Sequence, residues 1–398
     1  MALLKSENRD IVIVARDVWS EVRRRRHFLA AEWSRRHRVL FVEPPVSVPR
    51  LLTGRLDPSQ KEQKSATFLL KPPRKVADNI YVVTPIKPFI DSAPGLRDLN
   101  GLAFKRTVQY AVEHLGFIQP ILWITPEYGV RLLDSVPHSV SVYDVTDDWT
   151  QAGIPDAQKQ RISEDDRTLL SRADIVFVVS PKLLELKKPI RPDAILMPNG
   201  VLHEMYEAAE GSAAPDELRP APPPRVGYTG TLHEDRLDIG FIRRVAERGR
   251  GRYSLVLVGP NLLTPAAIDA LGRHKNIFII PAQPFDRLPA FLANFDVCMI
   301  PHLLTPFTHS LDPIKAYEYL ASGRPIVSTP VDGILPLKDY VALADNSDGF
   351  HDAIEFAIAG NGVSDSETRR AVARENSWEK RALEIESVID RYSSRKDN

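Results

Sequence analysis

Short, continuously apolar runs constrain the fold of this chain more than any other feature of its sequence. IVIVA follows Asp10, and similar runs recur as far as Pro325 to Ser328. The runs between them include VLFV at 39–42, IYVV at 80–83, ILWI at 121–124, IVFVV at 175–179, SLVLV at 254–258 and VCMI at 297–300. Runs without polar alternation are typical of strands buried on both faces of a parallel sheet. We therefore expect an α/β fold.

The opening of the chain reads as strand, helix, strand. Phe28, Leu29 and Trp33 recur at helical spacing between the first two apolar runs. A dinucleotide-binding unit would carry a GxGxxG turn after its first strand, and this one does not. The interpretation as a nicotinamide or flavin enzyme thus loses its main support.

The length of the chain predicts more than one domain. A chain of 398 residues exceeds one ordinary core. The segment EAAEGSAAPDELRPAPPP, at 207–224, is rich in Pro and Ala and reads as a semi-rigid linker. We expect a first domain over 1–203, a linker over 204–224, a second domain over 225–373 and a C-terminal helix within 374–398.

Charge and cysteine content exclude several classes of function. Lys plus Arg and Asp plus Glu both total 52, so the overall charge gives no case for a nucleic-acid partner. Cys298 is the single cysteine, which rules out an internal disulfide and a multi-cysteine metal site. No apolar run is long enough to span a membrane, and the polar start is not a secretory signal. We expect a cytoplasmic protein.

The stretch from Thr308 to Pro330 predicts a phosphate site. It reads as a turn, a helix from about Pro313 to Ser322 and a buried strand. Ser310 and Asp312 can cap the helix, whose free N–H groups and positive dipole end then favour an anion. Lys315 adds a charge in the first turn. Glu318, three residues on, lies on the same face, where a carboxylate can accept hydrogen bonds from a sugar diol.

These residues also carry a family resemblance. The helix PIKAYEYLASGRP, and earlier the strand ADIVFVVS followed by PNGV, resemble retaining, GT4-like (group 1) glycosyltransferases of the GT-B fold. The likeness is greatest to bacterial polysaccharide and teichuronic-acid-type enzymes. It implies two Rossmann-like domains facing across a cleft, with the C-terminal helix packed back on the first. It also implies a hexosyltransferase that needs no metal or other cofactor. Ser310 replaces the first of the two glutamates typical of the family.

The resemblance implies a donor site in the second domain. Lys315 and Arg236 would neutralise the departing diphosphate, and Glu318 would hold the ribose of a UDP- or GDP-sugar. The alternative for Arg236 is an exposed helix position. The alternative for Phe285 is an apolar plug, and the alternative for His309 is a turn residue. The other donor-binding candidates are Gly230, Thr231, Gln283, Ser310, Leu311, Asp312 and Ile314.

An acidic loop follows the strand at 140–143. Asp144 and Asp147 are candidate catalytic residues that could contact acceptor hydroxyls or the transferred sugar, and Asp148 is a candidate acceptor-binding residue with Arg16 and Trp19. The spacing of the three aspartates does not match a metal-binding DxD, so we expect no metal. A cluster of helix N-caps is the alternative explanation.

The first helix region is unusually basic. It contains Arg23 to Arg26, Arg35, Arg36 and Arg38. Such a helix can lie against anionic lipid head groups or reach a lipid-phosphate acceptor, so peripheral contact with the inner face of a membrane is one interpretation. A solvated helix face with local salt bridges is the other.

The sequence thus favours transfer of a sugar from a nucleotide-sugar donor to a glycan, lipid-linked or small-molecule acceptor. Synthesis of a cell-envelope or extracellular polysaccharide is the leading interpretation, and modification of a small natural product is the second. A sugar-nucleotide epimerase that uses Asp144, Asp147 and His309, and a non-catalytic scaffold, also stay open. The sequence does not identify the sugar, the nucleobase or the acceptor.

Overall fold

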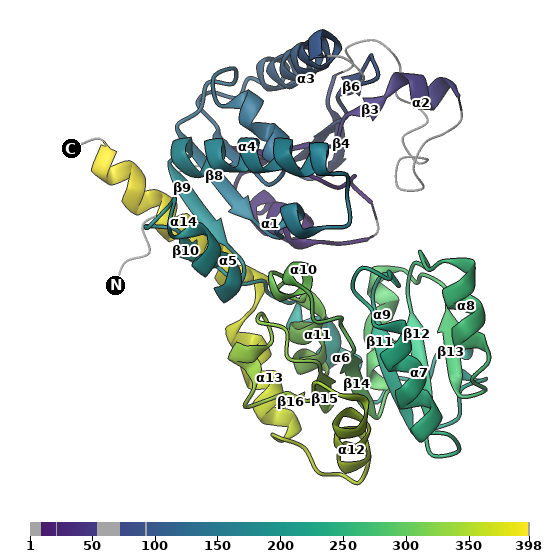
Figure 1. The fold of residues 1–398 in the computed structure, drawn as a ribbon. Helices are drawn as coiled ribbons and strands as arrows, with labels where there is room; N and C mark the ends of the chain where they lie inside the picture. The colour runs from purple at the N-terminus through teal and green to yellow at the C-terminus, as the bar shows by residue number, and fades with distance from the viewer. Residues whose placement is uncertain (1–8, 21, 54–71, 92–93, 397–398) are drawn as a thin grey trace.

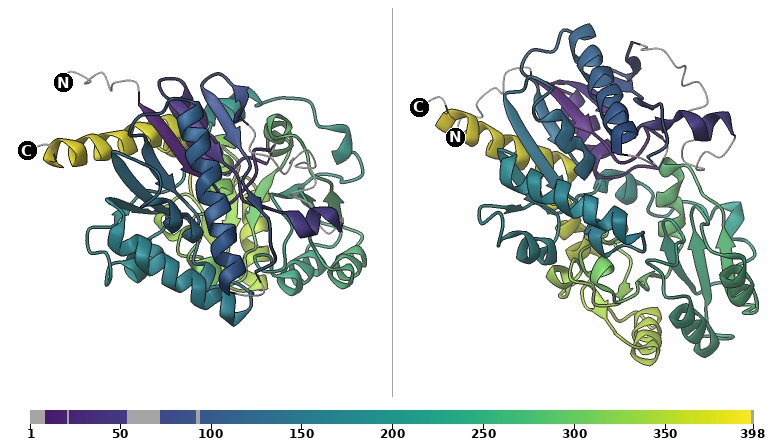
Figure 2. Two further views of the ribbon diagram at one scale, coloured as in Figure 1. Left: turned by 90° about the horizontal axis from the view of Figure 1, so that it is seen from above. Right: turned by 45° about the horizontal axis from the view of Figure 1, so that its top comes forward.

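The computed structural model describes residues 9–20, 22–53, 72–91 and 94–396. These residues form two α/β lobes, each built around a largely parallel sheet with helices on both faces (Figures 1 and 2). The expected α/β fold with two Rossmann-like units is therefore confirmed.

The first lobe contains an eight-stranded sheet in the order β10-β9-β8-β7-β1-β2-β5-β4. All neighbours pair in parallel except β4 and β5, which are antiparallel. Its strands are β1 (Asp10–Val14), β2 (Arg38–Val42), β4 (Arg74–Ala77), β5 (Ile80–Val83), β7 (Ile121–Ile124), β8 (Val140–Val145), β9 (Ile175–Val178) and β10 (Ile195–Leu196). A two-stranded sheet pairs β3 (Val46–Ser47) with β6 (Ile86–Lys87).

Helices cover both faces of this sheet. The helices of this lobe are α1 (Arg25–Ser34), α2 (Val48–Leu52), α3 (Pro94–His114), α4 (Asp156–Arg172) and α5 (Pro181–Lys187), with the 3₁₀ turns η2 (Glu127–Leu132) and η3 (Trp149–Gln151); α2 lies beside β3, away from the large sheet. Successive strand residues point to opposite faces, so Val12 and Val14 join one core cluster while Ile11 and Ile13 join the other. Both faces are buried, which explains why the strands read as continuous apolar runs.

The second lobe contains a six-stranded parallel sheet in the order β13-β12-β11-β14-β15-β16. Its strands are β11 (Arg225–Thr229), β12 (Ser254–Val258), β13 (Ile277–Ile280), β14 (Val297–Ile300), β15 (Ile326–Ser328) and β16 (Ala342–Leu343). The helices are α6 (His203–Ala208), α7 (Ile239–Arg248), α8 (Pro265–Gly272), α9 (Leu288–Ala293), α10 (Pro306–His309), α11 (Ile314–Ser322), α12 (Ser347–Ile358) and α13 (Ser366–Glu375), with η4 (Asp216–Leu218), η5 (Phe285–Arg287) and η6 (Leu335–Leu337).

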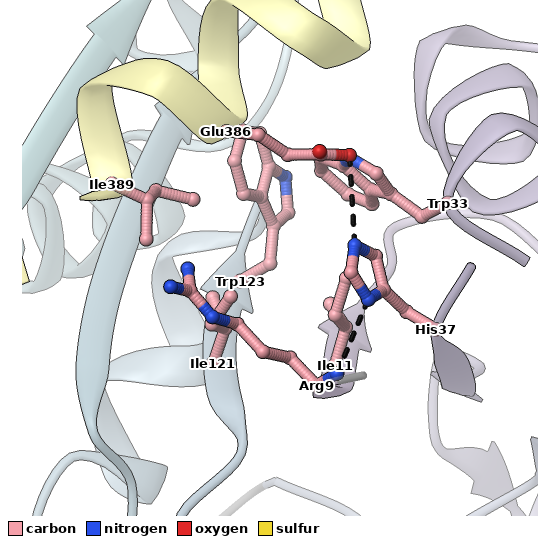
Figure 3. Close-up of a pocket in the computed structure, with 8 residues that line it drawn as sticks. All are labelled: Arg9, Ile11, Trp33, His37, Ile121, Trp123, Glu386 and Ile389. Atoms are coloured by element: carbon pink, nitrogen blue, oxygen red, sulfur yellow. Dashed lines mark hydrogen bonds and ion pairs between the residues drawn. The ribbon is translucent and has the colours of Figure 1, made fainter. Parts of the chain in front are cut away.

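The last helix, α14 (Trp378–Lys396), runs from the second lobe across to the first (Figure 1). Trp378 is fully buried and stacks on Phe28 of α1, with ring centroids 5.0 Å apart. Further along, Glu386 pairs with Arg36 at 2.7 Å. Figure 3 shows the joint between α14 and the first sheet, where Glu386 also faces His37 across 3.6 Å. The space left there is about 10 Å³, enough for one water molecule and no substrate.

The segment expected to be a linker contributes to the core of the second lobe. It contains α6 and η4, and Tyr206, Leu218 and Ala221 are buried in the same cluster as β12 and α11. The Pro- and Ala-rich composition concealed these three apolar side chains. The division into domains at 204–224 stays a prediction of the sequence.

Candidate functional site

A cavity of about 830 Å³ lies between the two lobes, with walls from both. Its lining residues follow the carboxyl ends of β1 and β8 in the first lobe, and of β11, β12, β13 and β14 in the second. Ligands of open α/β sheets bind at this edge of the strands. The topology therefore directs the loops of both lobes into one space.

Helix α11 begins at the cavity, but not with the caps expected from the sequence. Its N-cap is Pro313, which has no side-chain acceptor. Asp312 instead accepts the backbone N–H of Asn199 at 2.6 Å and the hydroxyl of Tyr317 at 3.1 Å. The helix ends at Gly323, whose φ of 71° suits glycine. No side chain of the described residues caps the first turn, and only the N–H of Ala316 is used there, by the carbonyl of Pro313 at 2.9 Å. The N–H groups of Ile314 and Lys315 stay available to an anion in the cavity.

Lys315, in the first turn of α11, lines the cavity. Its ammonium nitrogen is 4.9 Å from the centre of the Tyr228 ring, a cation–π contact. Burial, followed by the positive charge of Arg236, lowers the pKa of Lys315 to about 7, against a smaller opposing effect of Glu318. The amine therefore titrates near neutral pH, and an anion bound beside it would favour its charged form.

Glu318 lies one turn further along the same face and also lines the cavity. Burial raises its pKa above the ordinary value, and the nearby Tyr206 hydroxyl and Lys315 offset this only in part. The protein does not fully compensate the cost of burying this carboxylate, so hydrogen bonds from ligand hydroxyls would stabilise its charged form. Its role as predicted from the sequence fits this position. Tyr206, beside it, was not predicted because it falls in the segment interpreted as a linker.

Two glycines let the backbone approach α11 closely. Gly230 follows β11 with φ at 137°, and a Cβ there would lie 3.2 Å from Cε of Lys315. Gly259 follows β12 with φ at 149°, and a Cβ there would lie 2.1 Å from the carbonyl oxygen of Gly230. Side chains at either position would close the gap beside the lysine. Thr231 completes this part of the cavity wall.

Arg236 and Asp147 face each other from opposite lobes. Their closest charged atoms are 3.9 Å apart, and both line the cavity. Arg236 also lies 5.8 Å from the ring centre of Phe307. Its positive charge contributes to the lowered pKa of Lys315, so two cations converge where α11 begins. Arg236 is half-buried in a turn before α7, so the alternative of an exposed helix position does not apply to it.

The loop after β13 supplies Gln283 and Phe285 to the cavity wall. Phe285 packs on Phe28 of the first lobe at 5.4 Å between ring centroids, so it also serves as an apolar contact between the lobes. Gln283 donates to the carbonyl of Pro281 at 3.2 Å and accepts from Arg287 at 2.7 Å. Leu311 and Ile314 complete this wall.

His302 is a cavity residue that the sequence analysis did not assign to the site. It follows β14, is 2% exposed and lines the cavity beside Tyr228. Burial, then Lys315 and Arg236, lower its pKa well below the ordinary value, so the imidazole is neutral. Neither ring nitrogen has a hydrogen-bond partner within the described part of the chain. Among those residues, no group of three possible metal ligands is found.

Three predicted site residues hold the lobes or loops together instead of lining the cavity. Asp144 is fully buried and binds Nε of Arg25 at 2.9 Å, so it positions the arginine. Asp148 caps η3 by accepting the N–H of Thr150 at 3.2 Å, which agrees with the N-cap alternative. Ser310 accepts the N–H of Asp148 at 3.1 Å, so this side chain bridges the lobes.

Two further candidates also lie off the cavity wall. His309 bonds to Asp332 at 2.7 Å and belongs to the short helix α10, which agrees with its interpretation as a turn residue. Trp19 packs against His27 and Phe41. Each is held by its own lobe, so neither is placed to contact a ligand in the cavity.

The first-lobe wall is rich in arginine. Arg16 lines the cavity, pairs with Glu127 and stacks over Trp149 at 4.5 Å. The residues at 23–26 line it as well. They therefore face the cavity, not an outer helix surface. The three arginines at the other end of the basic region pair with acidic residues: Arg35 with Glu32, Arg36 with Glu386 and Arg38 with Asp10. Within the described ranges, no helix is long and apolar enough to cross a membrane.

Comparison with known proteins finds a family match over part of the chain and a shared fold over almost all of it. Residues 223–374 match the family model described as glycosyl transferases group 1. The putative teichuronic acid biosynthesis glycosyltransferase TuaH of Bacillus subtilis (strain 168) is 27% identical over 277 residues, which are 65% of this chain and 68% of that protein.

Two solved structures share the fold of almost the whole chain. Sucrose-phosphate synthase from Thermosynechococcus elongatus superposes with a TM-score of 0.70 at 15% identity, over 98% of this chain and 100% of that chain. HepE from Anabaena, in complex with UDP and glucose, superposes with a TM-score of 0.69 at 14% identity, over 96% of this chain and 100% of that chain. The matched family region contains α11, Lys315 and Glu318.

Proposed function

We propose that this chain, a group 1 glycosyltransferase with the GT-B fold, transfers a sugar from a UDP-sugar to an acceptor hydroxyl with retention at the anomeric carbon, in the GT4 manner. The observation that carries the proposal is the start of α11. Lys315 and Glu318 line one cavity there with Gly230 and Arg236. UDP is favoured over GDP because HepE, which shares the fold, was solved with UDP and glucose.

The donor fits this end of the cavity by charge. The diphosphate would accept hydrogen bonds from the free N–H groups of α11 and form ion pairs with Lys315 and Arg236. The carboxylate of Glu318 would accept hydrogen bonds from the ribose hydroxyls. Cations placed at the departing diphosphate stabilise the negative charge that develops as the glycosidic bond breaks. Gln283 and Phe285, further along the same wall, would border the nucleobase.

The proton balance supports a retaining route without a protein base. Four carboxylates occur among the described residues that line the cavity. Asp17 and Asp147 face arginines, Asp312 is hydrogen-bonded, and Glu318 is assigned to the ribose. The acceptor oxygen would bond to the anomeric carbon on the face that the diphosphate leaves. The departing phosphate oxygen would take the hydroxyl proton. No metal or other cofactor is required.

The acceptor would enter from the first lobe. Its wall at Arg16 and the residues 23–26 faces the start of α11 across the cavity. A glycan or lipid-linked acceptor in cell-envelope polysaccharide synthesis is favoured by the relative TuaH, which is named for teichuronic acid biosynthesis. We place the reaction in the cytoplasm, in keeping with the buried free thiol of Cys298. Contact with a membrane through Arg23 to Arg38 stays a prediction, and the ion pairs of Arg35, Arg36 and Arg38 reduce the cationic surface of this region.

Calorimetric titration with UDP and GDP tests the donor site. We expect micromolar binding of UDP to the unmodified protein, weaker binding of GDP, and at least a tenfold loss of UDP affinity in Glu318→Gln and in Lys315→Met. Each variant removes a charge and approximately keeps the length of the side chain. Glu247→Gln and Lys275→Met, at exposed positions of the same lobe, are matched controls and should bind UDP normally.

Two results would contradict the donor site. The first is absence of binding by either nucleotide to the unmodified protein. The second is equal affinity of the site variants and the matched controls, which would place the nucleotide elsewhere. GDP bound more tightly than UDP, and lost in both variants, would keep the site and correct the nucleobase.

A further inference from the structure

The N-terminus of α1 carries charges that oppose its own dipole. The N-cap is Arg24, whose side chain cannot accept a hydrogen bond, and Arg25 and Arg26 occupy the first turn, which holds no acidic residue. Positive side chains are unfavourable at the positive end of a helix, where anions are favoured. This arrangement faces the cavity and costs free energy unless an anion offsets it.

The protein supplies only part of the missing negative charge. Arg24 and Arg26 share Asp17, at 3.2 and 2.5 Å. Burial tends to raise the pKa of Asp17, but Arg26 and Arg24 outweigh this effect and hold it below its ordinary value. Arg23 stacks over Trp19 at 5.1 Å and makes no ion pair with the described residues.

The same wall contains two further arginines, each with one carboxylate behind it. Asp144 neutralises Arg25, and Glu127 neutralises Arg16. Among the described residues, Asp17 is shared by two arginines and Arg23 is unpaired, so the five arginines of this wall pair with only three carboxylates.

Buried guanidinium nitrogens also lack partners here. Arg25 is 3% exposed and uses Nε for Asp144 and Nη1 for the carbonyl of Pro198 at 2.9 Å. Its Nη2 has no hydrogen-bond partner among the described residues, and neither has Nε of Arg26. A buried charged donor without a partner is costly. Because Arg25 lines the cavity, a ligand can supply the acceptor that the protein does not.

We infer that the acceptor carries an anionic group, a phosphate or a carboxylate, which binds Arg23, Arg24 and Arg25 at the N-terminus of α1. This inference rests on the proposed function and names the class of its second substrate. The donor diphosphate is matched by Lys315 and Arg236 on the opposite lobe. The arginine wall is therefore left for a second anion.

The two anions would lie near each other. Arg24 is close enough to Lys315 to contribute to its lowered pKa, so the two sites face each other across the cavity. The anionic group would hold the acceptor by a charged hydrogen-bonded contact and bring its hydroxyl toward the sugar.

Binding of small probes to the UDP-saturated protein tests this inference. Saturating UDP occupies the donor site, so a second anion must bind elsewhere. Ligand-observed NMR titrations with glucose 6-phosphate, glucuronate and glucose would give three dissociation constants. We expect at least one anionic probe to bind about tenfold tighter than glucose, because a charged group adds a charge-assisted hydrogen bond.

Two variants assign this binding to the arginines. Arg23→Gln should weaken binding of the anionic probe about tenfold. Arg35→Gln, at the exposed far end of the same helix, should leave this binding unchanged. Arg25→Lys keeps the charge beside Asp144 but removes Nη2, and should weaken the probe as well. UDP affinity should stay unchanged in all three, which also shows that each variant is folded.

A separate experiment identifies the molecule that carries the anionic group. Phosphatidylcholine vesicles with and without phosphatidic acid test a lipid phosphate, and cosedimentation that depends on phosphatidic acid and on Arg23 would place the group on a lipid. Binding of glucose 6-phosphate or glucuronate alone would place it on a soluble or glycan acceptor.

Three outcomes would overturn the inference. Equal affinity for glucose and both anionic probes, with no effect of phosphatidic acid, would show that the wall does not select anions. Arg23→Gln lowering UDP affinity as much as probe affinity would assign the wall to the donor. Probe binding that is equally weakened by Arg35→Gln would reflect net charge only. Failure of the unmodified protein to bind UDP would instead contradict the proposed function.

Discussion

The lowered pKa of Lys315 gives a quantitative prediction for donor binding. In the free protein its pKa is about 7, whereas the ordinary value is 10.5. A diphosphate bound at α11 would stabilise the ammonium and return the pKa toward that ordinary value. At a pH below the pKa that Lys315 has in the free protein, the lysine is already charged before UDP binds. Above it, binding must take up a proton, so UDP affinity falls as the pH rises.

The size of this effect follows from linkage. With the free pKa near 7 and the bound pKa near its ordinary value, the dissociation constant of UDP should rise roughly 15-fold from about pH 7 to about pH 8.5. Uptake should approach one proton per UDP at the upper pH. The terminal phosphate of UDP is already ionised over this range, since a phosphate ester has its second pKa near about 6.

Two titratable groups near the lysine, His302 and Asp312, should not contribute. The pKa of His302 is lowered well below its ordinary value, so this imidazole is already neutral. Burial raises the pKa of Asp312 to about 6, so it is ionised above neutral pH. Calorimetry in buffers of different ionisation enthalpy, at several pH values, measures both the affinity and the proton uptake. Lys315→Met should bind UDP more weakly and without this pH dependence. A constant affinity of the unmodified protein, or the same slope in the variant, would refute the reasoning.

Three further predictions concern packing and protonation. Gly227→Ala should lower the free energy of unfolding by about 1–3 kcal/mol in urea titrations, because its Cβ would lie 2.0 Å from the ring of Phe295. Gly272→Ala is the control: a Cβ there meets no atom within 4 Å, so the free energy of unfolding should not fall. Trp378→Ala should cost about 3–5 kcal/mol by the same measurement, and an unchanged midpoint would show that α14 is not coupled to α1. NMR titration of His302 should show no protonation near its ordinary pKa of 6.5, and a normal titration curve would contradict its burial.

The sequence predicts the fold well because the signal is local. A strand buried on both faces must be apolar throughout, and each run reports this without reference to the rest of the chain. The donor side is similar: Lys315 and Glu318 share a face of α11 because they are three residues apart on one helix.

Residues whose roles depend on distant partners could not be assigned in this way. In the sequence Asp144 reads as the start of a loop after a strand, yet it lies within β8, and Arg25, 119 positions away, takes its carboxylate. Ser310 and Asp312 stand where helix caps are expected, but Asp148 and Asn199 of the other lobe engage them. A cap and a contact between lobes use the same short polar side chains, so sequence alone does not separate them.

The basic region shows the same limit. As a sequence it predicts either a membrane contact or a solvated face. The structure turns Arg23 to Arg26 into the cavity, which neither interpretation contained. Trp19, before α1, packs on Phe41 of β2, a contact between distant residues that composition does not reveal. Tyr206 was missed because its surroundings are low in apolar residues.

A crystal structure of the protein with UDP tests the central claim most directly. The account predicts the diphosphate at the N-terminus of α11, within hydrogen-bonding or ion-pair distance of Lys315, and the ribose hydroxyls on the carboxylate of Glu318. UDP bound with its ribose away from Glu318 and its phosphates away from α11 would contradict the assignment of this cavity as the donor site.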